Sequence, residues 1–178
     1  GVGGFSAMNA VAGAYAEQVP LVVLVGGPRT TQRRSSMLLH HGVGDFSTML
    51  EAYKHVTVAT ALLDDAEHAP ERIDRVLARC LSEKRPVMIE IPADMVDRAC
   101  AAPGAFAAPD RPASDPDALA EGLAEVMALL AQARRPAILC GVELHRYGLM
   151  DELMALVEAS GLPIATNLLG KTVLSEHH

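Results

Sequence analysis

The feature that most constrains the fold is a pattern that occurs four times along the chain. A helix-periodic segment ends, a proline follows, and a short apolar run begins, at Pro20, Pro86, Pro136 and Pro163. Proline is tolerated at the first residue of a strand, because no hydrogen-bond donor to a neighbouring strand is needed there. The runs after these prolines lack polar alternation, which is typical of strands covered on both faces, as in a parallel sheet.

The segments between these runs carry the periodicity of amphipathic helices. Asp115-Pro116 also favours a helix start, with Asp115 as the cap and Pro116 in the first turn. Alternating helices and strands predict an α/β fold, with parallel sheets and helices on both faces. The apolar stripes are Ile73, Val76, Leu77, Cys80 and Leu81; Leu119, Leu123, Val126, Met127 and Leu130; and Met150, Leu153, Met154 and Val157.

The composition changes between Ala99 and Asp117, where four prolines and many alanines occur without periodicity. Such a segment predicts a linker, partly extended because of its prolines. Residues 1–98 are therefore expected to be the later part of one α/β domain, and residues 118–178 the start of a second. The chain opens in a glycine-rich stretch without a methionine, so we expect an internal part of a longer protein. Whether His177 and His178 are native or a tag stays open.

Composition excludes several functional classes. The formal net charge is −7 and the basic residues form no patch, so nucleic-acid binding is not expected. No apolar run approaches the ~20 residues that span a bilayer, and no signal peptide is recognisable. Cys80, Cys100 and Cys140 are far apart and odd in number. Their spacing fits neither a disulfide framework nor a zinc site. We expect three buried thiols and a cytoplasmic protein.

Two segments could contact a ligand. Gly1 to Gly4 resemble the start of a phosphate-binding loop, but Ser6 replaces the last glycine of the G-x-G-x-x-G pattern. A ligand-facing loop and a tight turn before a helix both remain open. The stretch GGPRTTQRR follows the predicted strand LVVLV, and α/β sheets place ligands just beyond the carboxyl ends of strands. This stretch either lines a site or is solvated surface.

His40 and His41 are adjacent in the stretch LLHHGVGDF. Neighbouring residues point in opposite directions on a strand and about 100° apart on a helix, so they rarely bind one metal ion. No spacing provides a third ligand, and no metal site is predicted in this chain. Histidine changes its charge near neutral pH, which suits proton transfer. By spacing alone, a catalytic and a structural role both remain possible.

The sequence resembles the thiamine-diphosphate-dependent 2-oxo acid decarboxylases, which include pyruvate, indolepyruvate and phenylpyruvate decarboxylases. The resemblance covers essentially the whole chain. The histidine pair separates this family from the acetohydroxyacid synthases, which share the first stretch. The resemblance implies three α/β domains. Residues 1–98 would belong to the domain that binds the cofactor's aminopyrimidine, and residues 118–178 to the start of the middle domain. The matching stretches are FSAMNAVAGAYAEQVPLVVLVGGP, LLHHGVGDF, RPVMIEIPADMV and CGVELHRYGLMDELMALVEASGLPIATNLLGK.

This resemblance implies non-oxidative conversion of a 2-oxo acid to an aldehyde and CO₂ through a thiamine diphosphate enamine. The expected substrate is an aromatic or branched 2-oxo acid, with phenylpyruvate or indolepyruvate preferred and pyruvate possible. His40 and His41 would be catalytic, and Gly1, Val2 and Gly3 would contact the cofactor through their backbone. The activating glutamate and the ligands of Mg²⁺ would lie outside this chain, which alone should be inactive.

The resemblance also implies a homodimer or homotetramer. The alternatives are a carboligase of the acetolactate synthase type, on the same fold, and a binding subdomain without catalysis, since a fold does not by itself determine function.

Overall fold

The structure, a computed structural model, describes residues 1–34, 38–40, 42–109, 113–175 and 177. The chain divides into two compact units, Gly1–Asp110 and Arg111–His178, and each is described by itself. The division falls inside residues 99–117, the predicted linker. The assignment of residues 1–98 and 118–178 to particular domains of a larger protein stays a prediction.

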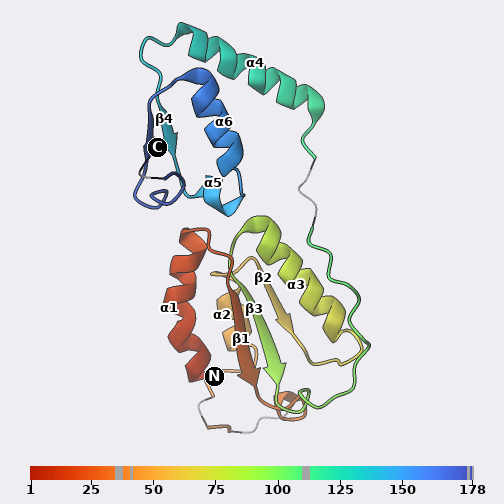
Figure 1. The fold of residues 1–178 in the computed structure, drawn as a ribbon. Coiled ribbons are helices and arrows are strands. Elements are labelled where there is room, and N and C mark those ends of the chain that lie inside the picture. Colours follow the sequence, from red (N-terminus) through yellow and green to blue (C-terminus); the bar gives the residue numbers. More distant parts are fainter. Residues whose placement is uncertain (35–37, 41, 110–112, 176, 178) are drawn as a thin grey trace. The chain divides into compact units, whose positions relative to one another are not determined.

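The first unit contains a three-stranded parallel sheet (Figure 1). Its strands are β1 (Val22–Gly27), β2 (Ala59–Leu62) and β3 (Val87–Pro92), in the order β1-β3-β2. Both pairings are parallel, with Val25 and Leu62 opposite Glu90 in the register. The predicted parallel sheet is confirmed. The proline pattern does not find β2, because no proline precedes this strand.

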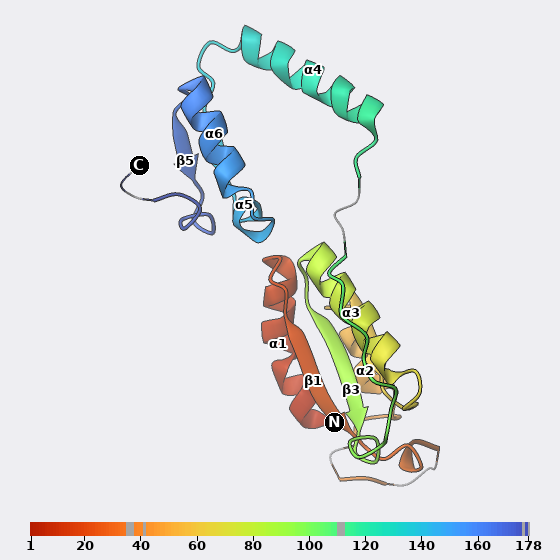
Figure 2. The same cartoon turned by 45° about the vertical axis from the view of Figure 1, so that its right-hand side comes forward.

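Helices cover both faces of this sheet, with α1 (Val2–Ala16) and α2 (Thr48–Tyr53) on one face and α3 (Ala69–Glu83) on the other (Figures 1 and 2). Successive side chains of the central strand β3 point to opposite faces. Met88 therefore packs with Tyr53 on one side, and Val87 packs with Val76 on the other. Burial on both faces explains why the β3 sequence is apolar without alternation.

Strand β1 does not share this double burial. Val23 and Val25 pack against the α1 face, but Leu24 is 64% exposed and Val22 is 40% exposed. Helix α3 packs against β2 and β3, and β1 lies at the edge of the described sheet. The expectation that the apolar strands are covered on both faces is therefore right for β3 and wrong for β1.

The second unit contains a parallel pair of strands, β4 (Ile138–Cys140) and β5 (Ile164–Thr166). Between them the chain forms α5 (Glu143–Arg146) and α6 (Met150–Ser160). Leu153 and Val157 of α6 are buried with Cys140 and Val173. The two strands after Pro136 and Pro163, and the apolar stripe of α6, are confirmed.

Helix α4 (Pro116–Gln132) begins where the sequence predicts. The Asp115 side chain caps the helix by accepting hydrogen bonds from the backbone nitrogens of Asp117 (2.9 Å) and Ala118 (3.0 Å). Its apolar stripe stays exposed, because no other described element packs against it; Leu119 and Leu123 are each 61% exposed. Periodicity thus predicts the helix but not a partner for it. Like the other described helices, α4 is not long and apolar enough to cross a membrane.

The three cysteines differ in their surroundings. Cys80 and Cys140 are buried, and burial raises the pKa of both thiols. Cys100 is exposed in the extended segment that follows β3. The expectation of three buried thiols is therefore wrong for Cys100. Helical periodicity placed Cys80 in a core, whereas Cys100 lies in a segment without regular structure.

Candidate functional site

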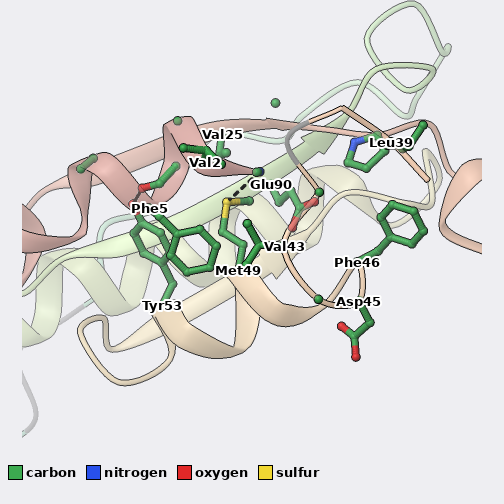
Figure 3. Close-up of a pocket in the computed structure, with 18 of the residues that line it drawn as sticks. Val2, Phe5, Val25, Leu39, Val43, Asp45, Phe46, Met49, Tyr53 and Glu90 are labelled. Atoms are coloured by element: carbon green, nitrogen blue, oxygen red, sulfur yellow. Dashed lines mark hydrogen bonds between the residues drawn. The ribbon is translucent and has the colours of Figure 1, made fainter. Parts of the chain in front are cut away.

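A pocket of about 720 Å³ lies at the carboxyl ends of β1 and β3, between the start of α1 and the loop that follows β1 (Figure 3). This loop, residues 28–47, is called the histidine loop. Pro28 and Gln32 line the pocket, so the stretch after the first predicted strand contributes to its wall. The volume suits a small molecule, and most of the wall is apolar. Its apolar side chains include Val2, Phe5, Val25, Val43, Phe46 and Met49.

The glycine-rich stretch forms the first turn of α1, with Gly1 as the N-cap and Val2 as the first helical residue. The stretch is therefore a helix start rather than a loop. Gly4 permits a close approach of α2, because a side chain there would overlap the sulfur of Met49. Gly1, Val2 and Gly3, the predicted cofactor-binding residues, all line the pocket.

His40 lies in the histidine loop after the short 3-10 helix Gln32–Arg34. Its side chain is exposed and lines the pocket. The structure thus brings His40 to the same pocket as Gly1, Val2 and Gly3, which lie almost forty positions earlier. The second predicted catalytic residue, His41, lies outside the described residues. The catalytic and cofactor-binding roles of these five residues stay predictions.

The start of the histidine loop is fastened to the segment after β3. The backbone nitrogen and the hydroxyl of Thr30 donate to the two carboxylate oxygens of Asp94, at 2.8 and 2.6 Å. These hydrogen bonds from the Thr30 side chain and backbone lower the pKa of Asp94. Asp94 therefore holds the loop most firmly when it is ionised.

A buried ion pair fastens the loop a second time. Arg33 Nη1 pairs with Glu90 on β3, and Arg33 Nη2 donates to the carbonyl oxygen of Phe46 at 2.8 Å. Glu90 lines the pocket and is only 1% exposed, and its Oε2 has no hydrogen-bond partner among the described residues. Sequence reasoning missed Glu90 as a site residue. The available signal was a single charge inside the apolar run VMIEIP.

The carboxylate of the histidine loop itself, Asp45, has a structural role. Its Oδ1 accepts hydrogen bonds from the Ser47 backbone nitrogen (2.8 Å) and hydroxyl (2.6 Å), just before α2. The side-chain and backbone hydrogen bonds from Ser47 lower the pKa of Asp45. In Figure 3 its carboxylate points away from Glu90. Asp45 thus shapes the turn that leads from His40 into α2.

Acid is expected to release the start of the histidine loop. Because the pKa of Asp94 is lowered in the folded state, its stabilising contribution is complete above the unfolded value of about 3.9. This contribution is lost as the pH falls through the folded pKa. The protection of the Thr30 amide against hydrogen exchange should therefore fall below about pH 4. Nuclear magnetic resonance can follow it, with the amide of Ile89 in β3 as the internal reference.

The variant Asp94→Asn should show the weaker Thr30 protection already at pH 7. Glu51→Gln is the control, because Glu51 is exposed on α2 and pairs only with Lys54 among the described residues. Wild-type Thr30 protection in Asp94→Asn at pH 7, while Ile89 stays protected, would show that Asp94 does not hold the loop.

No three histidine, cysteine, aspartate or glutamate side chains of the described residues gather so that they could hold a metal ion. The prediction that Mg²⁺ is bound by residues outside this chain is not tested by this observation. Among the described residues, the pocket combines a mostly apolar wall with His40 and the buried carboxylate of Glu90.

Comparison with known proteins finds one matching family model and several similar proteins. The model of the thiamine pyrophosphate enzyme central domain matches residues 123–178. The chain is 40% identical to the indole-3-pyruvate decarboxylase of Azospirillum brasilense, over 99% of this chain and 32% of that protein. It is 36% identical to the pyruvate decarboxylase of Aspergillus parasiticus and 34% identical to pyruvate decarboxylase 1 of Pisum sativum, each over 99% of this chain and 31% of the relative. The chain spans about a third of the length of these curated relatives.

Proposed function

We infer that this chain, which is similar to an indole-3-pyruvate decarboxylase and to pyruvate decarboxylases, belongs to the thiamine-pyrophosphate-dependent 2-oxo acid decarboxylases and forms part of the active site of such an enzyme. The proposed reaction converts a 2-oxo acid to an aldehyde and CO₂. The observation that carries the proposal is the position of His40 beside Gly1, Val2 and Gly3 at one apolar pocket. That pocket lies at the carboxyl ends of parallel strands, where α/β proteins place their ligands.

The residues of the pocket fit the ring system of thiamine diphosphate. Apolar side chains such as Phe5, Val25 and Met49 can pack against the faces of an aromatic ring. Glu90 Oε2 is a buried acceptor without a partner among the described residues, and Gly1 to Gly3 would hold the ring through their backbone. Bound thiamine diphosphate supplies an electron sink for the charge that remains when CO₂ leaves. Magnesium and its ligands are assigned to other parts of the full-length protein.

His40 is assigned two tasks in this reaction. A protonated imidazole attracts the carboxylate of the 2-oxo acid, and the same ring can donate a proton to the carbon that has lost CO₂. The apolar side chains of the wall strengthen both interactions, because charges are less screened beside them than in water. His41 is assigned to the same steps on the basis of its sequence match alone.

The proposed substrates are aromatic 2-oxo acids, phenylpyruvate or indolepyruvate, with pyruvate as a poorer substrate. Support comes from the 40% identity to a protein named indole-3-pyruvate decarboxylase, against 36% and 34% for two pyruvate decarboxylases. The pocket volume of about 720 Å³ also leaves room for an aromatic side chain. We further propose that the full-length protein works as a homodimer or homotetramer.

The full-length protein, supplied with thiamine diphosphate and Mg²⁺, tests this proposal. Pyruvate, phenylpyruvate and indolepyruvate are offered separately, and aldehyde and CO₂ are measured together. We expect both products, with a higher kcat/KM for the aromatic acids and no product when the cofactor is omitted. Acetolactate in place of aldehyde would identify a carboligase. No product from any substrate, together with no binding of thiamine diphosphate, would identify a binding subdomain.

A further inference from the structure

The Arg33–Glu90 ion pair is buried beside the pocket, which Glu90 lines. The Glu90 side chain is 1% exposed and that of Arg33 is 12% exposed. Strand β1 leaves space for this pair, because a methyl group at Gly27 would overlap the Glu90 carboxylate. The other Arg–Glu pair of the described residues, Arg79–Glu83, lies on the surface of α3 with side chains 54% and 37% exposed.

Stability alone does not explain the buried pair. Two charges lose their hydration when they are buried, and well-packed apolar residues in the same place are often as stabilising or more so. The cost is greater here because Glu90 Oε2 has no partner among the described residues. An ion pair that costs stability and lies beside a ligand pocket is a candidate for a functional role. The contacts of Arg33 indicate which role.

Arg33 joins the central strand to the far end of the histidine loop. One nitrogen of its guanidinium pairs with Glu90 on β3, and the other donates to the Phe46 carbonyl oxygen at 2.8 Å. The planar fork of arginine suits such two-point contacts better than lysine does. His40 lies between Arg33 and Phe46 in the sequence, so this contact closes the segment that carries it. The two ends of that segment, Arg33 and Phe46, are therefore tied to β3, the central strand of the sheet.

We propose that the Arg33–Glu90 pair positions His40 at the pocket, with Arg33 compensating the Glu90 charge that an anionic substrate would meet. Both residues are positioning residues that act through the histidine loop. The inference rests on the proposed function, because it assigns the pair a task in the turnover of a 2-oxo acid. The inference concerns residues of this chain, and it applies whichever 2-oxo acid is the substrate.

The two single variants should change KM in opposite directions in the full-length protein with its cofactor. Arg33→Met leaves a negative charge in the wall that repels the 2-oxo acid, and KM should rise about tenfold. Glu90→Gln leaves a positive charge that attracts the substrate, and KM should fall. In both variants kcat should fall by about 10- to 100-fold, because the histidine is no longer held in place. Unfolding of part of the sample would lower kcat without opposite changes in KM.

Two further variants separate charge from position. Arg33→Lys keeps the positive charge but loses the fork, so KM should return to the wild-type value while kcat recovers only in part. Gly27→Ala displaces the Glu90 carboxylate without changing any charge, so kcat should fall while KM stays near wild type. Gly13→Ala is its control, since nothing lies within 4 Å of a side chain added there.

The neutral double variant Arg33→Met/Glu90→Gln covers the case in which a single variant does not fold. Its control is Arg79→Met/Glu83→Gln, the same change at the exposed pair. We expect the buried double variant to retain the wild-type melting temperature to within a few degrees, yet to lose hydrogen-exchange protection at Gly42 and Ser47. Their backbone nitrogens donate to the Leu39 carbonyl oxygen (3.0 Å) and to Asp45 Oδ1 (2.8 Å). The control should lose no protection. Unchanged protection of these amides, or wild-type kcat in the folded double variant, overturns the inference.

The exchange measurement also separates this inference from the proposed function. If the wild-type protein makes no aldehyde, the proposed function fails whatever the exchange data show. If the wild-type protein is active, but the loop amides keep their hydrogen-exchange protection in the double variant, only the positioning role fails.

Discussion

Replacing His40 by alanine in the full-length protein is expected to lower the rate of aldehyde release by about 10²- to 10⁴-fold, the range typical of a lost general acid or base. The melting temperature should hardly change, because the His40 side chain is exposed and fills no core. Steady-state measurement of aldehyde with the best 2-oxo acid, alongside thermal unfolding, checks both statements. The sequence match predicts a similar loss of turnover for His41→Ala.

His55→Ala is the matched control for His40→Ala. His55 follows α2, is exposed and does not line the pocket, so its removal should leave turnover unchanged. Wild-type turnover of His40→Ala would remove His40 from the catalytic residues, even if the full-length protein proved to be a decarboxylase.

Tyr53→Ala is expected to reduce the free energy of unfolding by about 3–5 kcal/mol. The Tyr53 side chain is 0% exposed and packs with Val11, Met49 and Met88 between α1, α2 and the sheet. Its hydroxyl also donates to the Gly4 carbonyl oxygen at 2.6 Å, which ties α2 to the first turn of α1. Urea unfolding followed by circular dichroism measures the loss, which should appear in the midpoint rather than in the slope.

Tyr53→Phe separates the hydroxyl from the ring. It should cost about 1 kcal/mol, because the partly buried Gly4 carbonyl loses its donor. Tyr15→Phe is the control: among the described residues its ring stacks under Arg85 at 4.4 Å, a contact that phenylalanine preserves. Equal effects of the two Tyr→Phe changes would show that the bond from Tyr53 to Gly4 does not join α1 and α2.

Part of the site could be predicted from sequence because its residues stand at recognisable local positions. The histidine pair follows an apolar segment, and the glycines precede a helix-periodic stretch, so both could be named before the fold was known. Glu90 could not be named in this way. Glu90 lines the pocket because the start of α1 and the histidine loop lie beside β3, and its ion-pair partner, Arg33, lies 57 positions earlier. The residues next to Arg33 or Glu90 in the sequence do not predict this ion pair.

The sequence by itself determined the alternation of helices and strands, the cap at Asp115, the strands that follow prolines and the resemblance to the decarboxylases. These features depend on residues within a few positions of one another, where periodicity, caps and backbone restrictions act. Only the tertiary structure decided the order β1-β3-β2, the exposure of Leu24 and of the α4 stripe, and the meeting of His40, Gly1 and Glu90 at one pocket. Those outcomes depend on which distant segments pack against a given surface. The residue pattern of one segment does not predict which other segment will pack against it.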